Sequence, residues 1–342
     1  MSRLLVLGWH NVEATWCFPV QPGAGMRGLT RQLRWLRSAT TVVPLQPALE
    51  RLATGRRLPA RAVALTFDDG YADNLDLAST ALSGFGLPAT FFLVPGLLDA
   101  QASPWWEELA WAFVRSRRAH VQVRGVTVGL SDERSRRAAF QQEAERLKLL
   151  DRAARDHAVE QWVVRLDPQG DRPGAELFLD WAGARGLVRR GFDVGSHSSY
   201  HAILSRETPE AQTADLVGAT GRLRAELGVA PGMLAYPNGR FSDYDEATLA
   251  AAEAAGHRFA VTTQPGWTGP GTPRLEIRRS VVAPDWDLAT TLREAWSASR
   301  AMRVEHRRDR GRSGDSPAAA SRGAEPGLAV PLAPRPRPGR RV

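Results

Sequence analysis

The chain has 342 residues, of which 43% are hydrophobic and 8% aromatic, so it can bury a sizeable core and is not disordered in composition. Its formal net charge is +8, but residues 303–342 hold ten Arg against four acidic residues, a net of +6. The first 302 residues therefore carry only +2. Because the excess positive charge lies in this tail, we expect no nucleic-acid partner for the folded part.

A single cysteine, Cys17, excludes an intrachain disulfide. The apolar run Leu4–Leu7 is too short for the core of a signal peptide, and no stretch approaches the ~20 apolar residues of a membrane helix. We therefore expect a cytoplasmic protein. The tail, 303–342, is rich in Arg, Pro, Gly and Ala and is predicted to be disordered. It leaves open a peripheral contact with a membrane, and the oligomeric state is not predicted.

Predicted strands and helices alternate along the chain. Short runs rich in Val, Leu, Phe and Ile, bounded by Gly, Pro or polar residues, predict buried strands at residues 4–7, 42–45, 62–67, 89–94, 192–195, 233–236, 259–262 and 275–282. Helices are predicted between them at residues 29–38, 74–85, 209–227, 244–255 and 288–299. This alternation predicts an α/β fold with a largely parallel sheet, open or closed into a barrel, whose ligands sit at the carboxyl ends of the strands.

Residues 100–178 interrupt this alternation. Predicted helices at 105–118 and 131–164 flank a segment of alternating polarity, 121–128, that is typical of a hairpin. This insertion either covers or flanks the site, or it extends the scaffold without touching substrate, and both alternatives stay open. We predict one folded domain, 1–302, that contains the insertion.

Two adjacent carboxylates, Asp68 and Asp69, follow the predicted strand 62–67 in the sequence Thr-Phe-Asp-Asp-Gly. Adjacent acidic groups repel each other unless a cation compensates the repulsion. Because consecutive residues at a strand end point in different directions, one carboxylate can bind a metal ion while the other faces substrate. Taken alone, the pair is better explained by an Asp-Gly turn with a helix cap.

Two histidines, His197 and His201, follow the predicted strand 192–195 in the sequence Gly-Ser-His-Ser-Ser-Tyr-His. A helical turn would place residues four apart on one face, a spacing suited to one metal ion. Two His and one carboxylate are a common catalytic metal set that leaves positions open for water and substrate. Either His alone also fits a structural role. Together, the two motifs favour a metal site, because an α/β fold brings the carboxyl ends of its strands onto one face.

Together, these two motifs resemble the polysaccharide deacetylase family (carbohydrate esterase family 4), over about residues 1–300 apart from the insertion. The resemblance implies a distorted parallel (β/α) barrel, usually of about seven strands. It also implies that Asp69, His197 and His201 bind a divalent metal ion, commonly zinc and in some members cobalt or nickel. Asp68 would then be the base that takes a proton from the attacking water.

The segment Leu-Ala-Tyr-Pro-Asn-Gly at 234–239 departs from the Arg-x-Pro-x-Tyr pattern of many family members. It resembles the Tyr-Pro-x-Gly pattern of the exopolysaccharide deacetylase branch. The resemblance implies that the backbone N–H of Tyr236 stabilises the oxyanion of the reaction. The Arg that usually positions the base is missing at this point. Arg278 or Arg279, near the last predicted strand, is the predicted replacement, with Arg279 as the candidate.

The Leu-x-His motif that supplies the general acid in most members is also absent. His306 lies in the tail, and His257 stands at the amino end of its strand. His10 stands at the carboxyl end of the first predicted strand, where the exopolysaccharide branch has a similar His that serves as the acid. His10 is therefore the predicted proton donor to the leaving amine, a role that suits a His near neutral pH. A structural His beside Trp9 is the alternative.

The predicted reaction is hydrolysis of an N-acetyl group from an amino sugar, giving a free amine and acetate. A cytoplasmic location favours a glycan or glycolipid precursor over a mature cell-wall polymer. Three alternatives are left open: a metallohydrolase of acetyl esters, an inactive glycan-binding domain, and an RNA- or membrane-associating protein that uses the Arg-rich tail. Trp267 is predicted to stack on sugar. Surface or packing roles are predicted for His120, His157, Trp105, Trp106 and Trp111.

Overall fold

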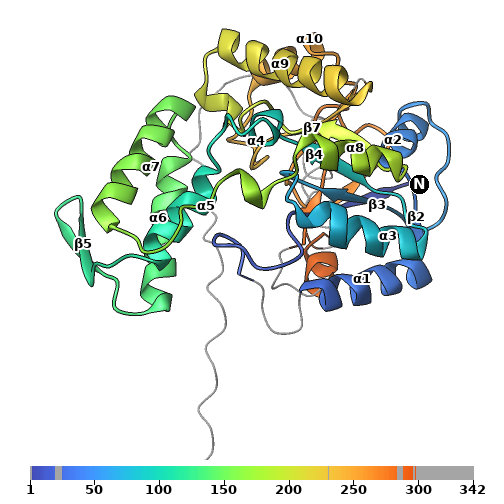
Figure 1. Cartoon of the computed structure of the whole chain (residues 1–342). Helices are drawn as coiled ribbons and strands as arrows, with labels where there is room; N and C mark the ends of the chain where they lie inside the picture. The colour runs from blue at the N-terminus through green and yellow to red at the C-terminus, as the bar shows by residue number, and fades with distance from the viewer. Residues whose placement is uncertain (1, 20–24, 230, 283–287, 296, 298–342) are drawn as a thin grey trace, which may run out of the picture. The chain divides into compact units, whose positions relative to one another are not determined.

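The apolar runs of the sequence form a curled sheet of mostly parallel strands in a computed structural model (Figure 1). The structure describes residues 2–19, 25–229, 231–282, 288–295 and 297. The tail predicted to be disordered, 303–342, lies outside these residues. The chain divides into one unit that ends at Ala301 and a second that begins at Met302.

Six parallel strands form the middle of the sheet in the spatial order β1-β3-β4-β7-β8-β9. Strands β1 and β3 are buried along their whole length, which explains their apolar sequences, because a parallel sheet covered on both faces has no polar side. The strands are β1 (Leu4–Trp9), β2 (Thr41–Val42), β3 (Ala62–Phe67), β4 (Thr90–Leu93), β7 (Asp193–Ser196), β8 (Met233–Ala235), β9 (Phe259–Val261), β10 (Trp267–Thr268) and β11 (Ser280–Val281).

One segment, residues 274–282, joins the two edges of this sheet. The Ile277 N–H donates to the Ala260 oxygen at 2.9 Å, and the Thr262 N–H donates to the Ile277 oxygen at 2.9 Å, which adds the segment to β9. Further along, β11 pairs in parallel with β1. Because the same segment contacts both β9 and β1, the sheet curls toward closure. The predicted distorted parallel (β/α) barrel is confirmed.

Helices follow most of the strands in the chain and cover the sheet (Figure 1). Helix α9 has the predicted bounds because Thr208 caps its first turn, Pro209 is its first residue, and Gly228 ends it in a left-handed conformation. The helical elements outside the insertion are α1 (Gly25–Ala39), α2 (Leu45–Ala53), η1 (Asn74–Ala78), α3 (Ser79–Phe85), α4 (Pro95–Leu98), η2 (Ala175–Leu177), α8 (Trp181–Arg189), η3 (Leu204–Arg206), α9 (Pro209–Leu227) and α10 (Glu246–Ala254). Residues 288–295 are also helical, as predicted.

Helices α2, α4 and α8 were not predicted from the sequence. Helix α2 begins at Leu45, so the predicted strand 42–45 is wrong at its end and only Thr41–Val42 pairs with β3. Helix α8 contains Gly183 and Gly186, which weaken a helical pattern. A Cβ atom on Gly186 would lie 3.0 Å from the Leu75 side chain, so this glycine lets α8 pack closely on η1.

The insertion forms three helices and a hairpin around an apolar core to which Tyr71, Val94 and Leu97 also contribute. Its elements are α5 (Trp105–Val114), β5 (His120–Val123), β6 (Val126–Gly129), α6 (Glu133–Leu147) and α7 (Arg152–Leu166). The predicted hairpin is confirmed, and its turn is made by Arg124 and Gly125, both with positive φ. The predicted helix 131–164 is wrong in one respect. It is two helices, because the Asp151 side chain accepts from the Ala154 N–H at 2.8 Å and starts a second one.

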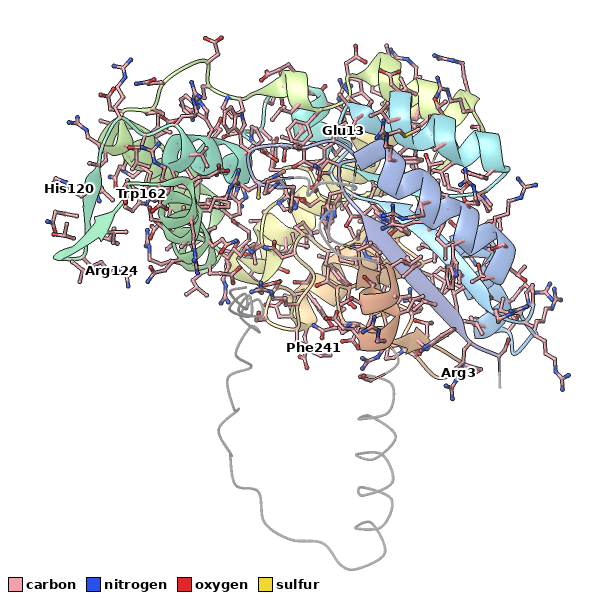
Figure 2. All side chains as sticks on the ribbon, turned by 90° about the horizontal axis from the view of Figure 1, so that it is seen from below. Arg3, Glu13, His120, Arg124, Trp162 and Phe241 are labelled. Carbon is pink, nitrogen blue, oxygen red and sulfur yellow. The ribbon has the colours of Figure 1, made fainter. Side chains whose placement is uncertain are left out.

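Most His and Trp residues of the insertion have the surface or packing roles predicted for them. His120 is exposed on the hairpin, which Figure 2 shows beside Trp162 of α7. His157 is also exposed, whereas the three Trp residues of α5 are buried. The prediction for Trp267 is wrong, because it pairs with Leu5 near the amino end of β1 and packs against the main core.

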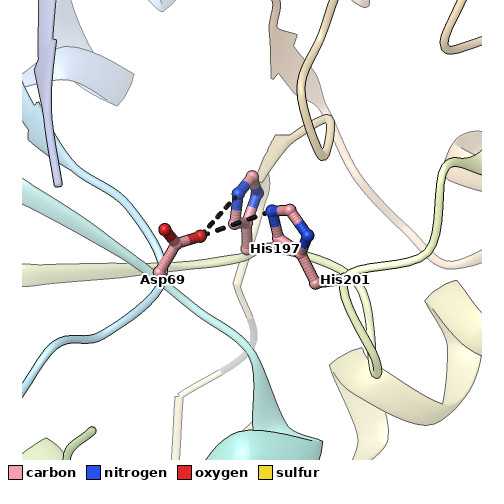
Figure 3. A group of neighbouring side chains, drawn as sticks. All are labelled: Asp69, His197 and His201. Atoms are coloured by element: carbon pink, nitrogen blue, oxygen red, sulfur yellow. Dashed lines mark ion pairs between the residues drawn. The ribbon is translucent and has the colours of Figure 1, made fainter. Parts of the chain in front are cut away.

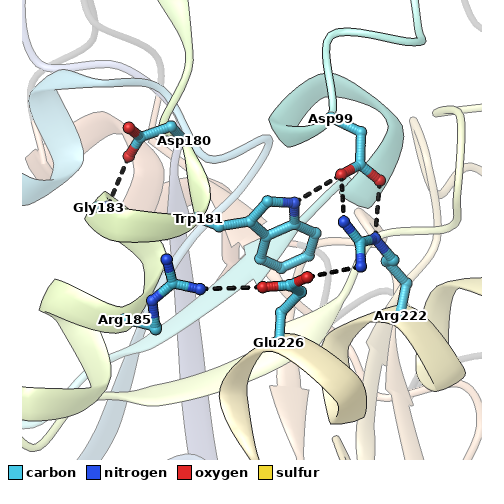
Figure 4. Close-up of polar contacts among 7 residues, drawn as sticks. All are labelled: Asp99, Asp180, Trp181, Gly183, Arg185, Arg222 and Glu226. Carbon is cyan, nitrogen blue, oxygen red and sulfur yellow. Dashed lines mark hydrogen bonds and ion pairs between the residues drawn. The ribbon is translucent and has the colours of Figure 1, made fainter.

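A polar network joins helices α4, α8 and α9 (Figure 4). Asp99, directly after α4, accepts hydrogen bonds from Trp181 Nε1 at 2.6 Å and from Arg222 Nε at 2.9 Å. The Arg222 guanidinium also lies over the Trp181 ring, 5.0 Å from its centroid. Glu226 accepts from both Arg222 and Arg185. The network therefore connects α8 and α9, the helices that precede and follow β7 in the chain. Strand β7 leads to the two histidines.

None of the helices in the described part of the chain has both the length and the apolar character that a membrane span requires.

Candidate active site

Asp68 and Asp69 follow directly from the last residue of β3. The Asp68 N–H donates to the Trp9 oxygen at 2.8 Å, which extends the pairing of β3 with β1 by one residue. Asp69 then takes a left-handed conformation (φ 69°), as does Gly70 (φ 75°). The chain therefore turns sharply at this point, and the two neighbouring carboxylates face different partners, as the sequence predicted.

His197 and His201 lie in the loop after β7 and face Asp69 (Figure 3). Asp69 Oδ1 is 3.3 Å from His197 Nε2 and 3.4 Å from His201 Nε2. All three side chains are buried. The helical turn predicted between the two histidines is wrong, because the loop is irregular. Ser198 and His201 adopt positive φ values of 63° and 50°, and this conformation brings both rings to one side.

The donor set fits a divalent metal ion. Asp69 Oδ1 is buried and makes no hydrogen bond with any described residue, and two ring nitrogens converge on it. His197 Nδ1 lies 2.7 Å from the Ala235 carbonyl oxygen, so a proton on Nδ1 leaves the Nε2 lone pair free for a cation. Two imidazole nitrogens and one carboxylate oxygen are ligands typical of zinc.

Charges within the site also favour a cation. Burial alone would raise the pKa of Asp69, but the facing imidazoles hold that pKa well below its usual range. Burial lowers the pKa of His201 to about 3, so this ring is neutral and can offer a lone pair. Burial acts in the same direction on His197, but Asp68 and Asp69 outweigh it and raise the pKa of that ring. Asp69 thus stays ionised and offers a negative charge that a divalent ion would balance.

Asp68 is held by Arg279. Arg279 Nη1 donates to Asp68 Oδ1 at 2.6 Å and to Thr66 Oγ1 at 3.2 Å, and Nε donates to the Thr262 oxygen at 3.2 Å. Both partners of this ion pair are almost fully buried. Burial alone would raise the pKa of Asp68, but the guanidinium lowers it below its usual value. Asp68 is therefore ionised and oriented. Gly8 leaves the space for Arg279, whose Cδ would lie 3.3 Å from a Cβ at that position.

The neighbouring Arg278 has a different role. Its Nη1 donates to the Pro265 oxygen at 3.2 Å. Of the two arginines considered from the sequence, the structure thus brings Arg279 to the base. Alternate residues of an extended segment point to opposite faces, so only one of two neighbours can enter the barrel.

His10 stands one residue beyond β1, beside the end of β3. Its ring stacks on Phe18 at 5.2 Å, and its carbonyl oxygen accepts from Asn74 Nδ2 at 2.8 Å. A little further along the chain, Asp73 Oδ2 accepts hydrogen bonds from two backbone N–H groups, that of Val12 at 2.7 Å and that of Glu13 at 2.9 Å. His10 is thus on the same edge of the sheet as Asp68 and Asp69, held by residues of the turn that follows them.

The sequence did not reveal Asp73 and Asn74 as part of this arrangement. Asn74 begins a π-helix, η1, and is fully buried. No signal in the sequence singled out Asn74, because its burial, which makes the amide require partners, is decided by the fold. Short π-helical turns are frequent at functional sites.

Two other residues considered from the sequence are engaged elsewhere. The Tyr236 N–H donates to the Val261 oxygen at 3.2 Å, so this amide is occupied within the sheet, and its oxyanion role stays a prediction. His257 is buried, with Nδ1 3.2 Å from the Pro231 oxygen, at the amino end of β9 as expected. His306 lies outside the described residues.

The loop that carries the histidines packs against Gly96 of α4. The Gly96 N–H donates to the Ser199 oxygen at 2.8 Å, and a Cβ on Gly96 would lie 2.5 Å from that oxygen. We expect Gly96→Ala to destabilise the protein by about 1–3 kcal/mol and to weaken metal binding, because the loop must move. Thermal unfolding and a chelator titration would measure both. Gly84→Ala is the matched control, since nothing lies within 4 Å of its Cβ position, and equal effects of both variants would refute the prediction.

Comparison with known proteins agrees with this geometry. The family model described as polysaccharide deacetylase matches residues 55–260. "Putative polysaccharide deacetylase YxkH" of Bacillus subtilis (strain 168) is 21% identical over 285 residues, 83% of this chain and 72% of that protein. Poly-beta-1,6-N-acetyl-D-glucosamine N-deacetylase of Escherichia coli (strain K12) is 30% identical over 102 residues, 30% of this chain and only 15% of that protein.

Solved structures support the fold. The deacetylase PplD of Streptococcus pyogenes, in complex with acetate, has a TM-score of 0.57 at 16% identity, covering 86% of this chain and 98% of that one. IcaB from Ammonifex degensii has a TM-score of 0.54 at 19% identity, covering 87% and 97%. The family match spans more than half of the chain and includes both the Asp-Asp and the His-x-x-x-His motifs. This chain therefore belongs to the polysaccharide deacetylase family, carbohydrate esterase family 4.

Proposed function

We propose that the protein is a metal-dependent de-N-acetylase of an amino-sugar-containing glycan or glycolipid. The observation that carries the proposal is the buried Asp69–His197–His201 cluster next to the buried Asp68–Arg279 pair. One carboxylate is arranged for a cation and its neighbour is kept ionised for proton transfer. The similarity to a poly-β-1,6-N-acetyl-D-glucosamine N-deacetylase supports an N-acetylated glycan as substrate.

The chain's own residues account for the proton transfers of amide hydrolysis. Asp68, ionised beside Arg279, takes a proton from the attacking water as its oxygen bonds to the acetyl carbon. His10, on the same edge of the sheet, gives a proton to the nitrogen as the C–N bond breaks. The products are acetate and a free amine. A zinc ion held by Asp69, His197 and His201, or cobalt or nickel in its place, would polarise the acetyl carbonyl and lower the pKa of water.

Acetate release would test this function. The substrates are β-1,6- and β-1,4-linked N-acetylglucosamine oligomers, an N-acetylated glycolipid, and acetylated xylan as the ester. We expect acetate from an N-acetylated substrate, loss of activity after metal removal by a chelator, and recovery with zinc or cobalt, because Asp69 Oδ1 has no hydrogen-bond partner among the described residues and a metal ion would balance its charge.

The outcomes separate the alternatives. Acetate from xylan alone would assign the site to ester hydrolysis. Binding of about one metal ion per chain without acetate from any substrate would favour a glycan-binding role. A protein that binds no divalent metal would contradict the proposal altogether.

A further inference from the structure

The two histidines of the cluster are supported in different ways. His197 Nδ1 contacts the Ala235 oxygen, the usual means by which a protein orients a metal-binding imidazole. His201 Nδ1 is buried and makes no hydrogen bond with any described residue. Its backbone is also left-handed, with φ of 50°, a strained conformation for a non-glycine residue that its surroundings must hold. Something other than a ring hydrogen bond must therefore orient His201.

Trp106 of α5 packs against the His201 ring. The two ring centroids are 4.5 Å apart at an interplanar angle of 47°. The indole is itself fixed, because Trp106 Nε1 donates to the Tyr71 hydroxyl at 2.8 Å and that hydroxyl donates to Glu107 Oε1 at 2.7 Å. All of these residues are buried. The imidazole of His201 therefore packs against a surface that cannot easily rotate away.

Arg155 of α7 holds the backbone of His201. Its Nη1 donates to the His201 carbonyl oxygen at 3.1 Å. Its Nε and Nη2 both donate to Asp156 Oδ1 at 3.0 Å, and its guanidinium lies 5.1 Å from the centroid of the Trp105 ring. The Arg155 side chain is only 2% exposed. A buried guanidinium aimed at one carbonyl stabilises the left-handed turn that presents the ring.

We propose that the insertion is a positioning element for the metal site, acting on His201 through Trp106 and Arg155. Both side chains contact His201 and neither is a member of the metal cluster. The insertion thus flanks the site and sets metal affinity by orienting one ligand. This inference rests on the proposed metal site.

The test measures metal binding directly. Zinc dissociation constants would be obtained by competition with a chromophoric chelator, and the visible spectrum of the cobalt-loaded protein would report ligand geometry. We expect Trp106→Leu and Arg155→Met to raise the Kd for zinc by about 10- to 100-fold and to change the cobalt spectrum. Trp106→Phe and Arg155→Lys should show smaller changes in the same direction, and they replace the stronger variants if those do not fold.

Arg165→Met is the matched control. Arg165 also lies on α7 and stacks on a tryptophan, 4.8 Å from the Trp162 centroid, but it donates to the Gln122 oxygen rather than to the histidine loop. Its Kd for zinc should stay within about twofold of the wild type. Wild-type zinc affinity and an unchanged cobalt spectrum in the folded Trp106 and Arg155 variants would overturn the inference and leave the proposed function intact. Failure of the wild type to bind metal would instead overturn the proposed function, and the inference with it.

Discussion

Replacing Asp68 by Asn should lower kcat by about 100- to 10,000-fold, the usual contribution of a positioned general base. Asn keeps the shape of the side chain and can still accept from Arg279, but it cannot take a proton. The metal cluster does not include this residue. We therefore expect zinc affinity to remain within about threefold of the wild type while acetate release is lost.

Kinetics of acetate release and a zinc titration on the same preparation would measure the two properties separately. Asp76→Asn is the control, since Asp76 is exposed on η1 and should not affect either. Full activity of the Asp68 variant would show that another group accepts the proton. Loss of zinc in that variant would place Asp68 among the ligands instead.

Arg279→Met should lower the free energy of unfolding by about 3–5 kcal/mol, because it leaves the Asp68 carboxylate buried without its partner. Arg279 is fully buried and its partner is nearly so, and the pair is joined at 2.6 Å. Methionine keeps much of the length and apolar volume of the arginine stem. The same change should reduce activity, because the base loses both its orientation and the charge that keeps it ionised.

Urea unfolding of the metal-free protein, together with acetate release, would test this expectation. Arg278→Met is a close control, since it removes the same kind of charge one residue away, and it should cost no more than about 1 kcal/mol. Arg279→Lys should recover part of the stability, because lysine restores the charge but not the fork of donors. Equal destabilisation by the Arg278 and Arg279 changes would contradict the assigned ion pair.

The apolar runs of the amino-acid sequence predict where the main strands lie and which polar groups stand at their ends. The runs before His10 and Asp68 are apolar because both faces of β1 and β3 are covered, and the polar residues begin where these strands end. Strand β7, before His197, is buried only in its second half and begins with the exposed Asp193. Since parallel strands expose their carboxyl ends on one edge, sequence order alone indicated that these side chains meet. The structure brings Asp69, His197 and His201 together as predicted.

How these groups are held depends on contacts that form in the folded chain. The tertiary structure placed Arg279, and not Arg278, beside Asp68, because the direction of a side chain depends on the register of its segment. It also showed that the histidine loop is irregular and that Trp106 and Arg155 of the insertion contact His201. These contacts join residues far apart in the chain, which has eleven Trp and is rich in Arg. No local pattern tells which of so many similar side chains will meet the site, because that choice is made by packing of the whole fold.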